Sequence, residues 1–584
     1  MGDSAPDVVI RGGVVVDGTG APARTADVAI VDGRITEVGR VSHRGRREIG
    51  ADGALVAPGW VDVHTHYDGQ ATWDTQLAPS SWHGVTTAVM GNCGVGFAPV
   101  HDHDHQRLIE LMEGVEDIPG AALHEGLAWG WNDFAGYLDA VDALPHDIDV
   151  AAQLPHGALR LFVMGERGAD REAASADEIA QMALIAESAI RAGALGFTTS
   201  RTLNHRTSRG QPTPTLTAAR EELVAIAAGV GRAGTGVLQL VSDFVDLEEE
   251  FGNVRAMAEA SGRPVSFSLV QNPFAPNAYR DLLERLESAA SAGLTIRGQV
   301  ATRAIGLLLG LQGTLNPVMA NPVYREIASL DLGERVAIMA EPMFKARLLK
   351  ADTGQRDTSK LGGGVVRLFD KMFVLGDPPD YEPDPDQNVA ALARREGRDA
   401  LEFVYDTLLQ DEGRRFLYLP ALNFASGNLD AVREMLLDDR TIPGLGDGGA
   451  HVGTICDGSF PTTLLTHWCR DRAGERLDVP FVVKAQCHDT ARAVGLRDRG
   501  VVAPGFKADL NVIDFNGLRC GPPEMHFDLP AGGRRLLQRA DGYLHTIVAG
   551  REVYRDGIAT GETPGRLVRG AQAAPRHRSN RSPR

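Results

Sequence analysis

The sequence has little cysteine: its 584 residues include 5 cysteines, an odd number without CxxC spacing. A disulfide framework needs paired cysteines and an oxidising compartment, so we expect a reducing, cytoplasmic location. No apolar run approaches the roughly 20 residues that cross a bilayer. The first residues also lack the charged and then apolar pattern of a signal peptide. These absences argue against a secreted domain held together by disulfide bonds and against a membrane protein.

Positive charge is also scarce. Asp and Glu number 77 against 59 Lys and Arg, which gives a net charge of −18. Nucleic acids and anionic membranes attract basic surfaces, so we expect neither as a partner. The chain has no G-x-S-x-G element after a strand and no P-loop. A small-molecule substrate is therefore the expected partner, and a homo-oligomer remains possible.

Both ends of the chain read as short strands. Apolar runs punctuated by Asp-Gly and Gly-Gly pairs fill residues 8–38 and return at 505–553, a texture typical of hairpins. Domain termini usually lie near each other. We therefore predict one small composite β-sandwich from residues 1–57 and 500–560.

The middle of the chain, residues 58–499, alternates apolar strands with helical patterns. This alternation predicts a parallel sheet, either a closed barrel or an open doubly wound sheet. An acidic, proline-rich stretch at 377–386 interrupts the rhythm and indicates an insertion near 345–412. Residues 561–584 end in a basic segment poor in apolar residues, and we predict a disordered tail there.

Four polar side chains follow apolar runs that read as strands. His64 and His66 end one such run, Cys93 follows the next, and Asp447 precedes two glycines far downstream. Residues two apart on an extended segment share a face, so both imidazoles point the same way. Each signal alone also fits a surface loop, a small buried hydrophobe or a turn. At the strand ends of one α/β barrel, however, the four could meet around one metal ion.

The chain resembles the amidohydrolase superfamily, and within it the D-aminoacylase (N-acyl-D-amino-acid deacylase) branch. The similarity covers about residues 7–555, and its motifs lie at residues 58–68, 84–87, 91–94, 113–119, 156–160, 193–196, 491–500 and 508–510. It implies an α/β fold with a metal-bearing, TIM-like (β/α)8 barrel beside the β-sandwich. It also implies an enzyme that hydrolyses a non-peptide amide C–N bond, with an N-acyl-D-amino acid as substrate.

The resemblance also assigns roles. His64, His66 and Cys93 match metal ligands, with zinc as the implied ion, and Asp447 matches the aspartate that acts as general acid and base. The family places one further histidine on each of two consecutive middle strands. The corresponding segments here, 236–243 and 264–271, contain none. We therefore expect one zinc ion rather than two.

The missing histidines leave other functions open. A cyclic-amide hydrolase is one alternative, and a barrel with a lyase, cyclase or ligand-binding role is another. Arg303 could fork onto a substrate carboxylate. The candidate substrate-binding residues are His156, Gln239, Asp243, Gln271, Arg303 and His451.

Overall fold

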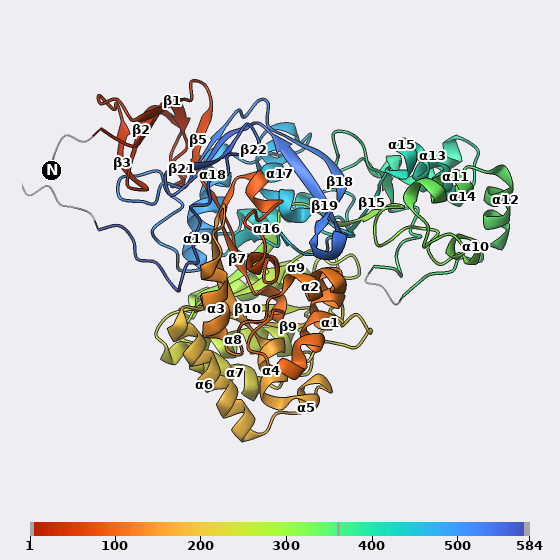
Figure 1. Ribbon diagram of the computed structural model, residues 1–584, viewed down its shortest axis with the longest axis horizontal. Coiled ribbons are helices and arrows are strands. Elements are labelled where there is room, and N and C mark those ends of the chain that lie inside the picture. Colours follow the sequence, from red (N-terminus) through yellow and green to blue (C-terminus); the bar gives the residue numbers. More distant parts are fainter. Residues whose placement is uncertain (1–4, 359–361, 577–584) are drawn as a thin grey trace, which may run out of the picture.

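The computed structural model describes residues 5–358 and 362–576, and its centre is an eight-stranded parallel sheet (Figure 1). The strands lie in the sheet in their order along the chain, from β6 at one edge to β16 at the other, and the chain leaves the sheet for a long excursion between the last two. The strands are β6 (Trp60–Asp62), β7 (Val85–Met90), β8 (Asp149–Pro155), β9 (Gly196–Arg201), β10 (Val237–Ser242), β11 (Val265–Leu269), β12 (Ile296–Ala301) and β16 (Thr441–Gly444).

The two edge strands are joined just beyond their carboxyl ends. The backbone N–H of Asp447 donates to the carbonyl of His64 at 3.0 Å, and the N–H of His66 donates to the carbonyl of Gly448 at 2.7 Å. The sheet thereby curls into a nearly closed barrel, which confirms the predicted (β/α)8 fold class. The seam is closed by the segments that carry the predicted catalytic residues.

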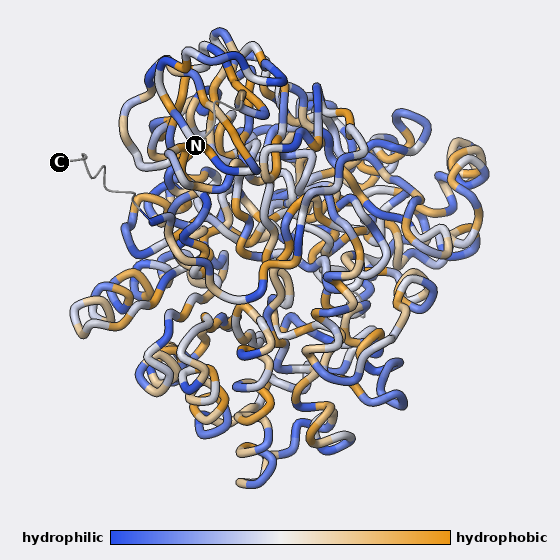
Figure 2. The backbone as a smooth tube through the Cα atoms, turned by 60° about the vertical axis from the view of Figure 1, so that its left-hand side comes forward, coloured by the Kyte–Doolittle hydropathy of each residue, from blue (hydrophilic) through white to orange (hydrophobic). Residues whose placement is uncertain are grey.

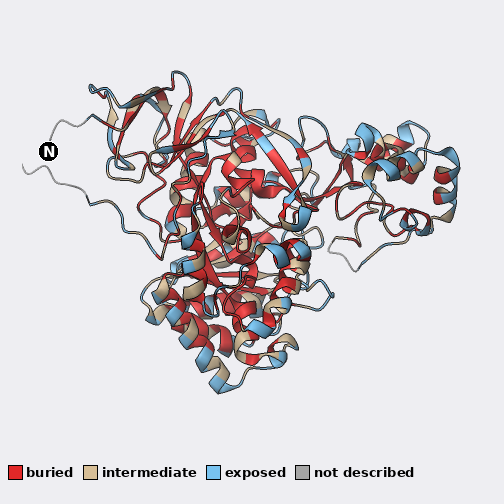
Figure 3. Cartoon of the chain, in the orientation of Figure 1, coloured by how far each residue is buried: buried red, intermediate tan, exposed pale blue. Residues whose placement is uncertain are grey.

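Helices cover the outside of the barrel because each presents one apolar face. The strands between them are almost wholly buried, and the outer helices alternate hydrophobic and hydrophilic residues (Figures 2 and 3). This pairing of buried strands and amphipathic helices is typical of parallel α/β folds. The principal outer helices are α3 (Phe134–Ala143), α6 (Ala176–Ala192), α7 (Arg220–Arg232), α8 (Leu247–Ser261), α9 (Ala278–Ser291) and α16 (Asp430–Leu437).

Strands from both ends of the chain share a second sheet of nine strands (Figure 1). Within this sheet, a strand from one end pairs with a strand from the other, β5 antiparallel to β17. The sheet consists of β1 (Val8–Val15), β2 (Arg24–Val31), β3 (Arg34–Gly39), β4 (Arg47–Gly50), β5 (Leu55–Pro58), β17 (Leu510–Ile513), β20 (Tyr543–Val548), β21 (Arg551–Arg555) and β22 (Ile558–Ala559). A two-stranded ribbon, β18 (Arg519–Leu529) with β19 (Gly533–Asp541), extends from it along the barrel.

The interruption predicted near 345–412 is part of a larger folded subdomain that projects from the barrel (Figure 1). It has a hydrophobic core of its own, because apolar residues from Leu307 to Leu419 cluster together. The subdomain contains β13 (Ile305–Leu309), α10 (Pro322–Arg325), α11 (Leu332–Met339), α12 (Pro342–Ala351), β14 (Phe373–Val374), α13 (Val389–Arg395), α14 (Ala400–Leu408), α15 (Gln410–Gly413) and β15 (Leu417–Leu422). The predicted insertion, near 345–412, therefore covers only part of this subdomain.

The acidic stretch of this subdomain is fastened to the rest of the molecule by Glu382. Its carboxylate accepts two hydrogen bonds from Arg472, at 2.8 and 2.9 Å. It also lies 2.7 Å from Nε2 of His467 and accepts the backbone N–H of Leu429 at 2.7 Å. The stretch is therefore an anchored segment.

The prediction of a disordered tail from residue 561 is wrong for residues 561–576. Leu567 and Val568 are buried, and the segment pairs with β8 at the base of the barrel. The N–H of Val150 donates to the carbonyl of Arg566, and the N–H of Val568 donates to the carbonyl of Val150. The rest of the predicted tail, 577–584, lies outside the described residues. Within the described part of the chain, no helix is long and apolar enough to span a membrane.

Candidate active site

Three of the residues predicted for the site follow strands in an unusual backbone conformation. Cys93 lies in the turn η3 (Asn92–Gly94) after β7 with φ 55°, and Asp447 and His451 after β16 have φ of 45° and 50°. Non-glycine residues in this left-handed region carry backbone strain and concentrate at functional sites. Gly91 permits the turn, since its φ is 85° and a Cβ there would lie 2.2 Å from the carbonyl oxygen of Gln153.

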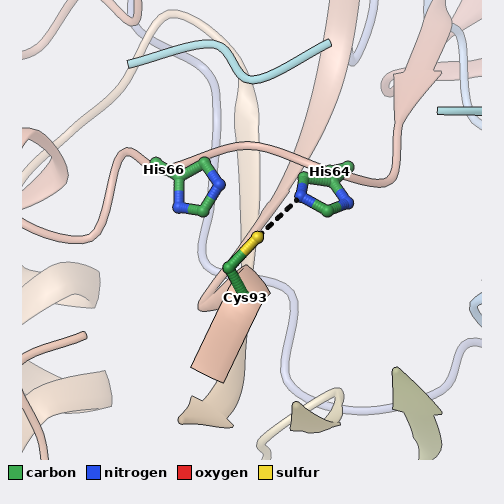
Figure 4. Close-up of side chains that lie close together, drawn as sticks. All are labelled: His64, His66 and Cys93. Atoms are coloured by element: carbon green, nitrogen blue, oxygen red, sulfur yellow. Dashed lines mark hydrogen bonds between the residues drawn. The ribbon is translucent and has the colours of Figure 1, made fainter. Parts of the chain in front are cut away.

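Two imidazoles and a thiol converge at this end of the barrel (Figure 4). Donor atoms of His64, His66 and Cys93 all lie within 4.8 Å of one another, and all three residues are buried. Nε2 of His64 is 3.3 Å from Sγ of Cys93. Neither ring nitrogen of His66 has a hydrogen-bond partner. A buried set of two nitrogen donors and one sulfur donor is one that zinc accepts, and it leaves a fourth position open, as catalytic zinc sites do.

Asp447 contacts the same two imidazoles. Its Oδ1 lies 3.3 Å from Nε2 of His64 and 3.6 Å from Nε2 of His66. It does not belong to the group of mutually close donors that includes Cys93. The carboxylate is therefore placed beside a three-donor site, where it can exchange a proton with a group bound there.

Burial shifts the pKa of each group in this cluster, and nearby charges add to that shift for Cys93 and oppose it for Asp447. Burial raises the pKa of the Cys93 thiol well above its usual value, and the nearby carboxylates of Glu116 and Asp447 add to the effect. Burial also lowers the pKa of His64 and of His66. Burial opposes ionisation of Asp447, but contact with His66 and His64 outweighs it and holds the pKa of Asp447 below its usual range. Asp447 is therefore an ionised acceptor at neutral pH.

Two residues that we did not predict face the other nitrogens of the imidazoles. Nδ1 of His64 lies 2.8 Å from Oε1 of Gln299, in the middle of β12. Nδ1 of His66 lies 3.2 Å from Oε1 of Glu116, the last residue of α1 (His105–Glu116). Glu116 belongs to the 113–119 motif, so the sequence could have identified it as a residue of the site. No sequence signal marks Gln299.

The two middle strands that lack the expected histidines carry amide and hydroxyl side chains instead. Gln239 on β10 is buried, and neither polar atom of its amide has a partner. The backbones of Gln239 and Ser266 are neighbours in register. The hydroxyl of Ser266 accepts from the amide of Gln299 at 2.9 Å. Since unpaired buried amides are costly, Gln239 is a candidate for contact with a bound molecule.

The other polar candidates are engaged by protein groups. Both ring nitrogens of His156, at the start of α4 (His156–Met164), have partners at 2.8 Å, Thr199 and Glu222. The Arg303 guanidinium lies 3.1 Å from Asp457 and 3.5 Å from the centre of the Tyr381 ring.

Asp243 and Gln271 hold neighbouring loops. Asp243 accepts from the hydroxyl of Thr202 and from the N–H of Leu203. Gln271 accepts from Ala425 and donates to the carbonyl of Pro276. These contacts leave both side chains with structural partners rather than free polar atoms.

Two further histidines lie beside the cluster. His451 is 3.6 Å from Glu116 and is only partly exposed. Burial, together with His451 and His66, lowers the pKa of His205 to about 3, so His205 is neutral. Its Nδ1 lies 2.8 Å from the hydroxyl of Ser200 on β9.

Known proteins share both sequence and architecture with this chain. The sequence pattern of the amidohydrolase family matches residues 47–554. An uncharacterised protein of Mycobacterium tuberculosis is 28% identical over 95% of this chain and 93% of its own length. D-aminoacylase of Alcaligenes xylosoxydans xylosoxydans is 34% identical over 34% of this chain and 38% of its own.

Two solved structures share the fold. A D-aminoacylase described with a binuclear metal centre has a TM-score of 0.64 at 24% identity, over 96% of this chain and 99% of its own. N-acyl-D-glutamate deacylase of Bordetella bronchiseptica, solved with zinc and a phosphonate inhibitor, has a TM-score of 0.63 at 22% identity, over 97% of this chain and all of its own.

Proposed function

Because the chain belongs to the amidohydrolase family, a group of hydrolases of non-peptide C–N bonds, we propose that it is a metal-dependent deacylase of N-acyl-D-amino acids. One observation carries the proposal. Two imidazoles, a thiol and an aspartate that are spread over nearly 400 residues of sequence meet where the barrel strands end. In α/β barrels this end carries the catalytic residues.

We assign the metal to His64, His66 and Cys93, with zinc as the ion. The donor types fit zinc, and a ligand role accounts for Nε2 of His66, which is buried without a hydrogen-bond partner. We propose one ion, because β10 and β11 contribute Gln239, Ser266 and Ser268 to the barrel rather than imidazoles. An ion held there would polarise an amide carbonyl and would make water a better nucleophile at neutral pH.

The protein's own part in the reaction is proton transfer and positioning. Asp447, kept ionised by the two imidazoles, accepts a proton from the attacking water and returns it to the leaving nitrogen. Gln239 can hydrogen-bond a polar group of the substrate, since its amide lacks protein partners. His451 borders the same space through its contact with Glu116.

Arg303 is left out of the proposed substrate site. Asp457 already neutralises its guanidinium, and Tyr381 and Phe460 lie on its faces. A second carboxylate would have to displace a buried ion pair, which is costly. We likewise assign a structural role, and no contact with substrate, to His156, Asp243 and Gln271.

The test is a substrate panel combined with metal analysis. Purified protein should contain zinc, release amino acid from N-acyl-D-amino acids, lose activity on chelation and recover it when zinc is restored. Turnover that survives complete removal of metal would refute the metal assignment. Turnover of cyclic amides with none of N-acyl-D-amino acids would refute the substrate assignment alone.

A further inference from the structure

Both imidazoles of the cluster have the same kind of neighbours. Nε2 of His64 and Nε2 of His66 face Asp447. Nδ1 of each faces a side-chain oxygen from a different element, Gln299 for His64 and Glu116 for His66. An oxygen beside Nδ1 favours the tautomer with its proton there and leaves Nε2 free as a metal donor.

We infer that Gln299 and Glu116 are positioning residues that fix the ring orientation and tautomer of the two histidine ligands. The inference rests on the proposed function, since it needs an ion at His64, His66 and Cys93. It adds two residues that act on the ligands and not on the substrate.

Gln299 is itself fixed by a neighbour. Its amide nitrogen donates to the hydroxyl of Ser266 at 2.9 Å, so the amide oxygen is the atom turned toward His64. Gln299 is buried in the centre of β12, where the strand backbone limits its motion. The result is a chain of hydrogen bonds from Ser266 on β11 through Gln299 to His64 after β6.

Glu116 is fixed by its backbone. Its carbonyl accepts the N–H of His451, and the next residue, Asp117, accepts the N–H of Gly453 at 3.2 Å and the hydroxyl of Thr314. The end of α1 is thus tied to the segment that follows β16, and the carboxylate is brought between His66 and His451.

The surroundings of Glu116 also point to this role. The residue is 1% exposed, and neither carboxylate oxygen forms a well-aligned hydrogen bond, although Oε1 lies 3.2 Å from His66 and Oε2 lies 3.6 Å from His451. A buried carboxylate without hydrogen bonds is destabilising on its own. A cation bound to the neighbouring imidazole would compensate its charge and draw its oxygen onto the Nδ1 proton.

The test compares zinc affinity among full-length variants, measured by competition with a chromophoric chelator. Gln299→Leu and Glu116→Leu should each weaken zinc binding about 10- to 100-fold and shift the visible absorption bands of the cobalt-substituted protein. Gln299→Glu and Glu116→Gln keep an acceptor oxygen and should recover most of the affinity. Gln106→Leu and Glu110→Gln, elsewhere on α1, are matched controls that should bind zinc like the wild type.

The outcomes separate this inference from the proposed function. If the wild type binds no zinc, the proposed function fails. If the wild type binds zinc and both leucine variants bind it as tightly, with unchanged cobalt spectra, the positioning role is refuted. If the leucine variants do not fold, Glu116→Asp decides, because it keeps the charge but withdraws the oxygen. Wild-type affinity in that variant would refute the role of Glu116.

Discussion

Replacing Asp447 by Asn separates its proposed chemistry from its structural position. Asparagine has nearly the same shape and tolerates the left-handed backbone that Asp447 adopts, with φ 45°. The hydrogen bond that closes the barrel seam uses the backbone N–H of residue 447, which the substitution leaves in place. The variant should therefore fold and should still bind the ion through His64, His66 and Cys93.

The expected loss lies in kcat. A positioned general acid and base accelerates a reaction about 10²- to 10⁴-fold, which corresponds to an activation free energy lower by about 3–5 kcal/mol at 25 °C. The amide of asparagine cannot accept the proton of an attacking water, although it can still contact the imidazoles at about the distances that the carboxylate occupies, 3.3 and 3.6 Å. We therefore expect kcat to fall by that factor, with KM and zinc content close to those of the wild type.

The assay is steady-state hydrolysis of the best N-acyl-D-amino acid, with zinc content measured on the same preparations. Asp556→Asn is the matched control, because Asp556 has φ 49° in an exposed turn far along the chain. A folded, zinc-loaded Asp447→Asn enzyme with wild-type kcat would refute the assignment of Asp447 as acid and base.

Three further predictions concern stability and substrate contact. Burial opposes ionisation of Glu382, but hydrogen bonds from His467 and Arg472 lower its pKa to about 2 from 4.5. The Glu382 carboxylate should therefore contribute about 3 kcal/mol to the free energy of unfolding at any pH above its unfolded pKa. This contribution should disappear as pH falls from about 4.5 to 2. Chemical denaturation should show Glu382→Gln less stable than wild type at pH 7, with the difference vanishing in acid; a pH-independent difference would contradict this. Gln239→Leu should raise KM without lowering the free energy of unfolding, because it removes an unpaired buried amide; unchanged KM would remove Gln239 from the substrate site. Truncation after Gly561 should cost about 4 kcal/mol of stability through the loss of Leu567 and Val568, and an unchanged denaturation midpoint would contradict the docking of this segment.

The sequence was most informative where function depends on strand ends. His64 and His66 share a face because they are two residues apart after an apolar run, and local spacing alone predicts that. Cys93 and Asp447 needed the family resemblance, since a buried cysteine or an aspartate before glycines is common elsewhere. The alternation of strands and helices, a local pattern repeated along the chain, predicted a parallel sheet, and the family resemblance was needed to choose a closed barrel over an open sheet.

The remaining features depend on contacts between distant residues. Gln299 meets His64 across 235 positions, and Arg303 meets Asp457 across 154. The contact with His64 places Gln299 at the site, although no sequence pattern marks it. The contact with Asp457 occupies Arg303, which the sequence analysis gave as a candidate to bind a substrate carboxylate. The segment at 561–576 was misjudged because its arginines masked two apolar residues that pack only against the folded barrel.

Zinc-edge X-ray absorption on the purified, zinc-loaded protein tests the central claim most directly. We predict one zinc per chain, with a single sulfur neighbour at about 2.3 Å and nitrogen or oxygen neighbours at about 2.0–2.1 Å, and loss of the sulfur signal in Cys93→Ala. A metal shell without sulfur in the wild type would contradict the three-ligand site of His64, His66 and Cys93.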